Sequence, residues 1–208
     1  MYNYPNETKN INISNSSSYY VIYTKNNKTI TEKLEYKNIE DINFISSSIE
    51  KVLNKKPCIH KLLYRASRDG DSSLIFHRNC DGIPNTVIII ETIKGKKFGG
   101  FTSQIWDRNG DFKYDENCFL FSLNKKEIYY IKNPDIAILC SKNKGPNFGS
   151  GSDICIEDNC MRNNSNFTFQ SSFYYRNENY ALNDEKFFTV KDLDVYQVDF
   201  GDYTIIKK

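Results

Sequence analysis

The chain has 208 residues, and its 28 Lys and Arg residues against 26 Asp and Glu residues give a formal net charge of +2 at pH 7. This length predicts one domain, or one domain with a short extension, and the balanced charge lacks the basic stripe of nucleic-acid-binding proteins. Because no apolar run approaches the length of a transmembrane helix and no secretory signal opens the sequence, we expect a cytoplasmic protein with reduced cysteines.

The N-terminal part of the chain is polar, and we expect residues 1–45 to form an extension ahead of a domain at residues 46–208. Residues 1–19 are rich in Asn and Ser. Residues 19–36 carry many Val, Ile, Tyr and Thr residues on either side of Asn26–Asn27. This composition favours a hairpin of two strands with the asparagine pair at its turn.

The first helix is predicted at the start of the domain. Ser46–Ser48 supplies candidate N-cap residues, and the residues that follow place Ile49, Val52 and Leu53 on one inward face. Pro57 is expected to end this helix, because proline disrupts a helix interior.

A second helix is predicted where the sequence reads DSSLIFHRNCDG, at residues 71–82. Asp71, Ser72 and Ser73 are all good N-cap residues, and the pattern predicts two helical turns that end near Asp81. The preceding segment, residues 60–66, is compatible with either a helix or an extended strand.

From residue 84 onward the pattern changes to strands. Residues 86–93 read TVIIIETI, a continuous apolar run that is typical of a strand buried on both faces. Residues 97–106 are expected to pair with it. Gly99–Gly100 inside that second strand indicates a bulge or the close approach of another element.

The remaining strands are short and alternate in polarity. Phe119, Phe121 and Leu123 share one face of a predicted strand, and Trp106 is expected in the core. Strands of this length, at intervals of roughly ten residues, favour a sandwich or a barrel. With the early helices, the pattern predicts a mostly antiparallel domain of the α+β or all-β class. Further strands are predicted at residues 127–131, 135–140, 152–157 and 188–200.

Reactive side chains gather on the predicted helix at residues 71–82. Ser73, His77 and Asp81 lie at i, i+4 and i+8, along one face. Side chains in a row on one helix do not converge on a substrate atom, however, and working triads are assembled from separate elements. We therefore expect a structural role here. The alternative is an enzyme or an oxidant scavenger that uses Cys80 or His77.

No cofactor or metal site is predicted. The six cysteines form no CxxC pair, and the chain has only two histidines. The glycine-rich stretch at residues 145–151 is followed by a predicted strand, without the lysine and the helix of a phosphate-binding loop.

Six stretches of the chain form an ordered set: LLYRASRDG at 62–70, FHRNCDG at 76–82, FGGFTSQIW at 98–106, CFLFSL at 118–123, PNFGSGSDICIEDNC at 146–160 and FTVKDLDVYQV at 188–198. In this order they resemble the TLDc domain family, and the resemblance covers residues 57–200. It implies an α+β class that is mostly β, a two-sheet antiparallel β-sandwich with a few short flanking helices, in agreement with the pattern.

The resemblance also implies a function. TLDc domains are linked to resistance to oxidative stress, and several bind the vacuolar-type proton-pumping ATPase. It thus implies a non-catalytic binding or regulatory module, with the cytosolic sector of that pump as the candidate partner. Loops of a sandwich are the natural binding surface. The candidates are residues 107–117, which mix acidic and basic side chains, and residues 141–153, which place Lys142 and Lys144 beside a glycine-rich turn.

Overall fold

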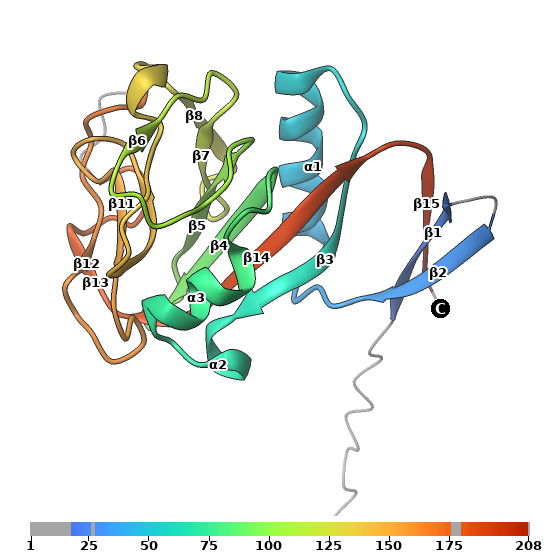
Figure 1. The fold of residues 1–208 in the computed structure, drawn as a ribbon, viewed down its shortest axis with the longest axis horizontal. Coiled ribbons are helices and arrows are strands. Elements are labelled where there is room, and N and C mark those ends of the chain that lie inside the picture. The colour runs from blue at the N-terminus through green and yellow to red at the C-terminus, as the bar shows by residue number, and fades with distance from the viewer. Residues whose placement is uncertain (1–17, 26–27, 176–179, 208) are drawn as a thin grey trace, which may run out of the picture.

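The computed structural model describes residues 18–25, 28–175 and 180–207, and within these residues the strands form three antiparallel sheets (Figure 1). The main sheet has the order β3 (Pro57–Arg65), β14 (Val190–Phe200), β4 (Thr86–Thr92), β5 (Lys97–Thr102), β7 (Phe119–Ser122) and β8 (Glu127–Tyr130). The second sheet has the order β13 (Phe187–Phe188), β12 (Asn166–Phe167), β11 (Ile154–Glu157), β10 (Lys144–Phe148), β9 (Ile138–Leu139) and β6 (Phe112–Lys113).

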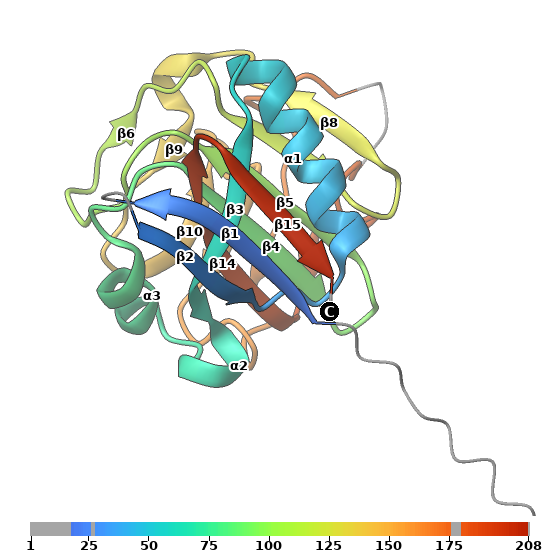
Figure 2. The same cartoon turned by 90° about the vertical axis from the view of Figure 1, so that its right-hand side faces the viewer.

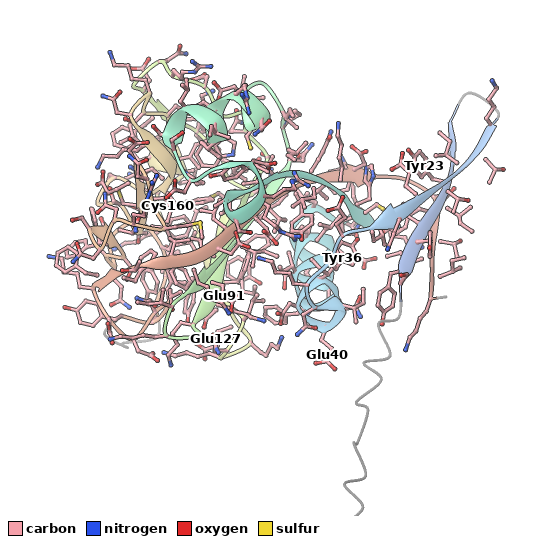
Figure 3. All side chains as sticks on the ribbon, turned by 90° about the horizontal axis from the view of Figure 1, so that it is seen from below. Tyr23, Tyr36, Glu40, Glu91, Glu127 and Cys160 are labelled. Carbon is pink, nitrogen blue, oxygen red and sulfur yellow. The ribbon has the colours of Figure 1, made fainter. Side chains whose placement is uncertain are left out.

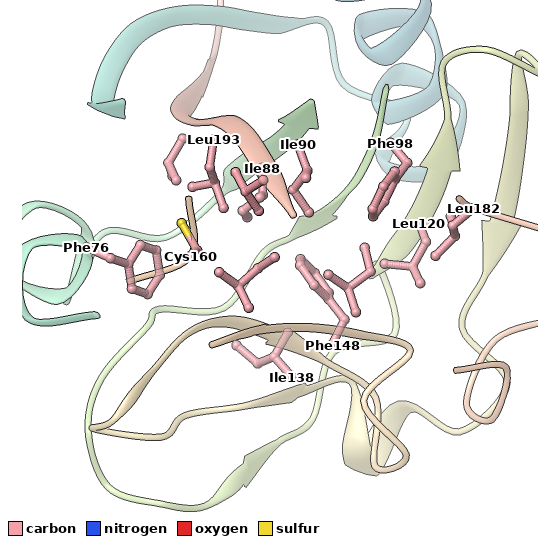
Figure 4. Packing of buried hydrophobic residues seen from close by; sticks show 14 of the residues in the cluster. Phe76, Ile88, Ile90, Phe98, Leu120, Ile138, Phe148, Cys160, Leu182 and Leu193 are labelled. Atoms are coloured by element: carbon pink, nitrogen blue, oxygen red, sulfur yellow. The ribbon is translucent and has the colours of Figure 1, made fainter. Parts of the chain in front are cut away.

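The main and second sheets pack face to face around one core. Ile88, Ile90 and Phe98 of the main sheet meet Ile138 and Phe148 of the second sheet in a single buried cluster (Figure 4). The predicted two-sheet antiparallel sandwich with short flanking helices is confirmed. The predicted strand at residues 135–140 is shorter than expected, because its first part forms the 3-10 helix η1 (Pro134–Ile136).

The far face of the main sheet is covered by helix α1 (Ile39–Leu53), as Figures 1 and 2 show. The prediction that this helix begins at Ser46–Ser48 is wrong. Its N-cap is Asn38, whose side chain accepts a hydrogen bond from the backbone N–H of Glu40 at 2.8 Å. The helix ends at the left-handed residue Asn54, before Pro57. No helix in the described part of the chain is both long and apolar enough to cross a membrane.

Two shorter helices lie at one end of the main sheet. They are α2 (Ala66–Asp69) and α3 (Ser73–Cys80), and α3 is the two-turn helix that the sequence predicts. The segment at residues 60–66, left open between helix and strand, is extended: it belongs to β3 up to Arg65. Strand β3 ends at Arg65 and leads directly into α2, which begins at Ala66.

Both faces of the central strands are buried, as predicted. Along β4, Ile88 and Ile90 enter the core between the sheets, while Val87 enters the cluster under α1. Phe119, Phe121 and Leu123 share the α1 face. Trp106 is buried, and its indole N–H donates to Thr86 Oγ1 at 3.0 Å.

The N- and C-terminal strands form a small sheet of order β15 (Tyr203–Lys207), β1 (Tyr19–Lys25) and β2 (Lys28–Leu34). The predicted hairpin is present, although its turn at Asn26–Asn27 lies outside the described residues. Strand β15, which the sequence reading missed, pairs with β1. Helix α1 runs across position 45, where the sequence places the start of the domain, and that boundary stays a prediction.

Candidate functional site

Helix α3 is capped from a distant part of the chain. Ser72 occupies the N-cap position, but its side chain makes no capping hydrogen bond. Instead, Asp158 Oδ1 accepts two hydrogen bonds from Ser73, one from its backbone N–H at 2.7 Å and one from its side-chain hydroxyl at 2.9 Å. The backbone N–H of Ser73 is the largest cause of a lowered pKa of Asp158, so this carboxylate stays charged at the positive end of the helix.

The row of Ser73, His77 and Asp81 does not form a catalytic triad. His77 Nδ1 lies 2.7 Å from Asp81 Oδ1, but the Ser73 hydroxyl is bound to Asp158. A nucleophile needs the base within hydrogen-bond reach. The helix therefore carries a histidine and a carboxylate without a paired serine.

His77 is buried, with an exposed fraction of 1%, and both of its ring nitrogens are occupied. Nδ1 faces Asp81, and Nε2 lies 2.9 Å from the carbonyl oxygen of Ser141 and 3.1 Å from that of Lys144. Carbonyl and carboxylate oxygens only accept hydrogen bonds. Each ring nitrogen therefore already contacts an oxygen of the protein itself, and the buried ring is not open to a substrate.

Cys80 has no exposed surface, which confirms its predicted burial. Burial raises the pKa of the Cys80 thiol well above its ordinary value, and the charges of Asp81 and Asp69 raise it further. A reactive cysteine needs the opposite, an accessible site that lowers the thiol pKa. All six cysteines are buried free thiols: Cys58, Cys80, Cys118, Cys140, Cys155 and Cys160.

The other five thiols share this environment. Burial is the largest cause of a raised pKa at each, to about 11 for Cys140 and Cys155 and to about 12 for Cys58 and Cys160. For Cys118 the pKa rises well above the ordinary value. Neutral, covered thiols react slowly with oxidants.

The C-terminal end of α3 holds the two candidate loops together. His77 binds the carbonyl oxygens of residues 141 and 144, in one loop. Asp81 accepts a hydrogen bond from Arg108 Nε of the other loop at 2.9 Å. The backbone N–H of Gly82 donates to the carbonyl oxygen of Trp106. We call His77, Asp81 and Arg108 the loop clamp.

The loop at residues 107–117 is more rigid than its composition indicates. Asp115, expected among its surface charges, is buried and accepts hydrogen bonds from the Thr102 and Ser103 hydroxyls at 2.7 Å. Besides the charged side chains of Arg108, Asp111 and Glu116, the loop exposes two aromatic ones: the exposed fractions are 42% for Phe112 and 54% for Tyr114. The sequence reading overlooked both, because exposure of a Phe on a two-residue strand leaves no periodic signal.

The loop predicted at residues 141–153 is interrupted by a strand. Strand β10 occupies its middle, and Lys144, expected as a free surface charge, pairs with Glu157 Oε1 at 2.7 Å. Asp153 is buried and accepts the backbone N–H groups of Ser171 and Ser172. Lys142 stays exposed. The surface available at this segment is therefore small.

The sequence of the chain matches a known family model and a known protein. The family model described as the TLDc domain matches residues 12–199. The chain belongs to the TLDc family. The match begins well before residue 57, where the resemblance in the sequence starts. The chain is also 35% identical over 63 residues to the MTOR-associated protein MEAK7 of Danio rerio, a match that covers 30% of this chain and 14% of that protein.

This TLDc domain also contains a buried ion pair that the sequence reading missed. Arg65 of β3 binds Asp194 of β14 through two hydrogen bonds of 2.8 Å, and the Asp194 side chain is 4% exposed. Next to it, burial would raise the pKa of Asp192, but hydrogen bonds from Lys37 and Ser67 lower it below its ordinary value. The available signal was a pair of acidic residues, Asp192 and Asp194, at alternate positions among the apolar residues of one strand.

Helix α2 is held by hydrogen bonds within residues 62–70, one of the stretches that resemble the TLDc family. The Tyr64 hydroxyl donates to the carbonyl oxygen of Gly70 at 2.8 Å, and Asp69 accepts the backbone N–H of Arg65 at 2.9 Å. Arg68 pairs with its neighbour Asp69. Among the described residues, no group of three or more His, Cys, Asp and Glu side chains is placed to hold a metal ion.

Proposed function

We propose that this TLDc protein is a non-catalytic binding and regulatory module of the cytoplasm. It contributes to oxidative-stress resistance and acts on the cytosolic sector of the vacuolar-type proton-pumping ATPase. The single observation that carries the non-catalytic part is the occupancy of His77, whose two ring nitrogens both face acceptor oxygens of the protein itself. Membership of the TLDc family supports the pump as the proposed partner.

The rival is an enzyme or scavenger that uses Cys80 or His77. A thiol nucleophile acts as the thiolate and must reach its substrate. Cys80 has no exposed surface, and its pKa is raised by burial. A scavenger acting through other cysteines meets the same difficulty, because each of the six is buried.

The surface that suits a partner best is the 107–117 loop. It is held at Lys113, whose ammonium binds Asp107 at 2.5 Å and the carbonyl oxygen of Ile105 at 2.8 Å. The rigid loop presents Phe112 and Tyr114 to solvent. Aromatic side chains on a pre-organised loop suit the centre of an interface, which would cover about 800 Å² on this side.

Truncating this aromatic pair is expected to weaken partner binding. We predict that tagged wild-type protein recovers pump subunits from its own cells, and that Phe112→Ser combined with Tyr114→Ser reduces recovery about tenfold or more, because buried aromatic anchors carry much of the binding energy. Phe187→Ser is the matched control, since Phe187 is 53% exposed on β13 of the second sheet.

Each variant is first shown to melt like the wild type. If folded wild-type protein recovers no pump subunit under conditions in which a known pump-binding protein does, the pump is not the partner. If recovery is the same for the aromatic double variant and for Phe187→Ser, the partner stands but the 107–117 loop is not its binding surface.

A further inference from the structure

A groove of about 690 Å³ opens where the small sheet meets the ends of β3 and β14. Figure 3 shows Tyr23 on the small sheet, outside the body of the sandwich. Tyr23 and Glu32 of the small sheet line one side, and His60 and Asp199 of the main sheet line the other. This groove lies apart from helix α3 and from both candidate loops.

His60 is the unusual group of this groove. Its side chain is 10% exposed, and Nε2 lies 2.6 Å from Asp199 Oδ2, so this nitrogen carries a proton and donates it. Nδ1 is buried and has no hydrogen-bond partner within the described residues. The nearest charged atom, Glu32 Oε2, is 3.4 Å away.

The distance to Glu32 indicates what Nδ1 lacks. A charge-assisted N–H···O bond closes to about 2.7–2.9 Å, and the Asp199 contact is shorter still, at 2.6 Å. By contrast, Nδ1 and Glu32 Oε2 are 3.4 Å apart and share no hydrogen bond. A ligand with two N–H donors can lie against this edge and donate to both atoms when Nδ1 is unprotonated.

Charge and aromatic surface define the ligand further. Among the described residues that line the groove, Glu32, Asp199 and Asp202 carry carboxylates and Lys61 carries an ammonium group. The Glu32 and Asp199 side chains are 48% and 58% exposed, so they remain accessible. The Tyr23 ring lies 5.8 Å from the His60 ring, and its hydroxyl holds Glu32 Oε1 at 3.0 Å.

We propose that this groove binds a guanidinium group, such as the side chain of an arginine. The planar guanidinium presents several N–H donors in one fork, which matches the carboxylate of Glu32 together with the lone pair of His60. Its flat face suits the Tyr23 ring. The proposal does not depend on the pump or on the 107–117 loop.

The test is a titration of the full chain with three blocked probes, followed by the ¹⁵N signals of the His60 ring. They are N-acetyl-arginine amide, its neutral analogue N-acetyl-citrulline amide, and an acetylated Gly-Arg-Gly amide. We expect both arginine probes to shift the Nδ1 signal and citrulline to bind at least about tenfold more weakly. If the tripeptide binds more tightly than N-acetyl-arginine amide, the natural ligand is an arginine within a protein segment. If the two bind equally, the natural ligand is a small guanidinium compound.

Glu32→Gln is expected to weaken arginine binding about tenfold or more, because it removes the charge opposite the guanidinium. The matched control is Glu40→Gln on helix α1, which Figure 3 shows away from Tyr23. Equal binding of citrulline, equal loss in both variants, or no shift with any probe overturns the proposal. So does a free protein in which both His60 nitrogens carry protons, because Nδ1 would then not be an acceptor.

Discussion

Replacing Arg65 by methionine is expected to lower the free energy of unfolding by about 3–5 kcal/mol, because breaking a buried ion pair leaves the partner charge without compensation. Asp194 is the partner, and its side chain is 4% exposed. Lys37 lies 3.3 Å from Asp194 but is itself bound to Asp192 at 2.6 Å, so it replaces Arg65 only in part. Urea denaturation of the full chain measures the loss.

Lys94→Met is the control. Lys94 binds Glu185 at 2.5 Å, and both side chains of this pair are exposed, to 64% and 46%. Exposed ion pairs contribute about 0–1 kcal/mol, so this variant should unfold nearly as the wild type does. Similar losses in the two variants would show that the Arg65–Asp194 pair has no special weight in the stability of the fold.

Gly99→Ala is expected to destabilise the protein by about 3 kcal/mol or more, because the added methyl group would overlap the backbone of the neighbouring core strand. An added Cβ at residue 99 would lie 1.8 Å from the carbonyl oxygen of Ile88. That oxygen belongs to β4, the adjacent strand, and so the two strands would have to separate. Thermal melting measures the change.

Gly95→Ala provides the comparison for Gly99→Ala. Gly95 also lies beside β4, but a Cβ there meets nothing within 4 Å. Its backbone φ of +77° makes alanine cost about 1–2 kcal/mol through left-handed strain alone. A Gly99→Ala protein that melts no lower than Gly95→Ala would contradict the steric reading of the glycine pair.

Much of the sandwich follows from local sequence pattern. The apolar run around Ile88 predicts a strand covered on both faces, and alternation around Phe119 predicts which side chains share a face. Gly99 predicts the close approach of the neighbouring strand. These features depend on the period of the strand and on nearby residues, which a single sequence displays.

The features that the sequence did not reveal depend on distant partners. The cap of α3 comes from Asp158, 85 residues after Ser73. Asp115 reads as a surface charge until the Thr102 and Ser103 hydroxyls are brought to it. The start of α1 was misplaced for a local reason. The three serines at 46–48 are good N-cap residues, but the helix begins after Asn38, and acidic residues from Glu40 onward lie in its first turn.

The candidate site also has a part that the sequence predicts and a part that depends on the tertiary fold. The sequence predicts that α3 is helical and that Cys80 is buried. It does not predict that His77 and Asp81 join two segments that begin near residues 107 and 141, because those contacts need the tertiary fold. The residue types of the helix are those of reactive sites, but the structural role that we expect from their spacing agrees with the contacts of the loop clamp.

The proposed protection against oxidants, measured as the survival of treated cells that carry Cys80→Ser and compared with their amount of folded protein, tests most directly whether helix α3 is structural. A hydroxyl in this fully buried site costs about 1–3 kcal/mol, so the melting temperature and the amount of folded protein should fall together with survival. Cys118→Ser, at a 1% exposed site outside α3, should follow the same relation. A Cys80→Ser protein that melts like the wild type yet gives no protection would contradict this and identify Cys80 as a reacting thiol.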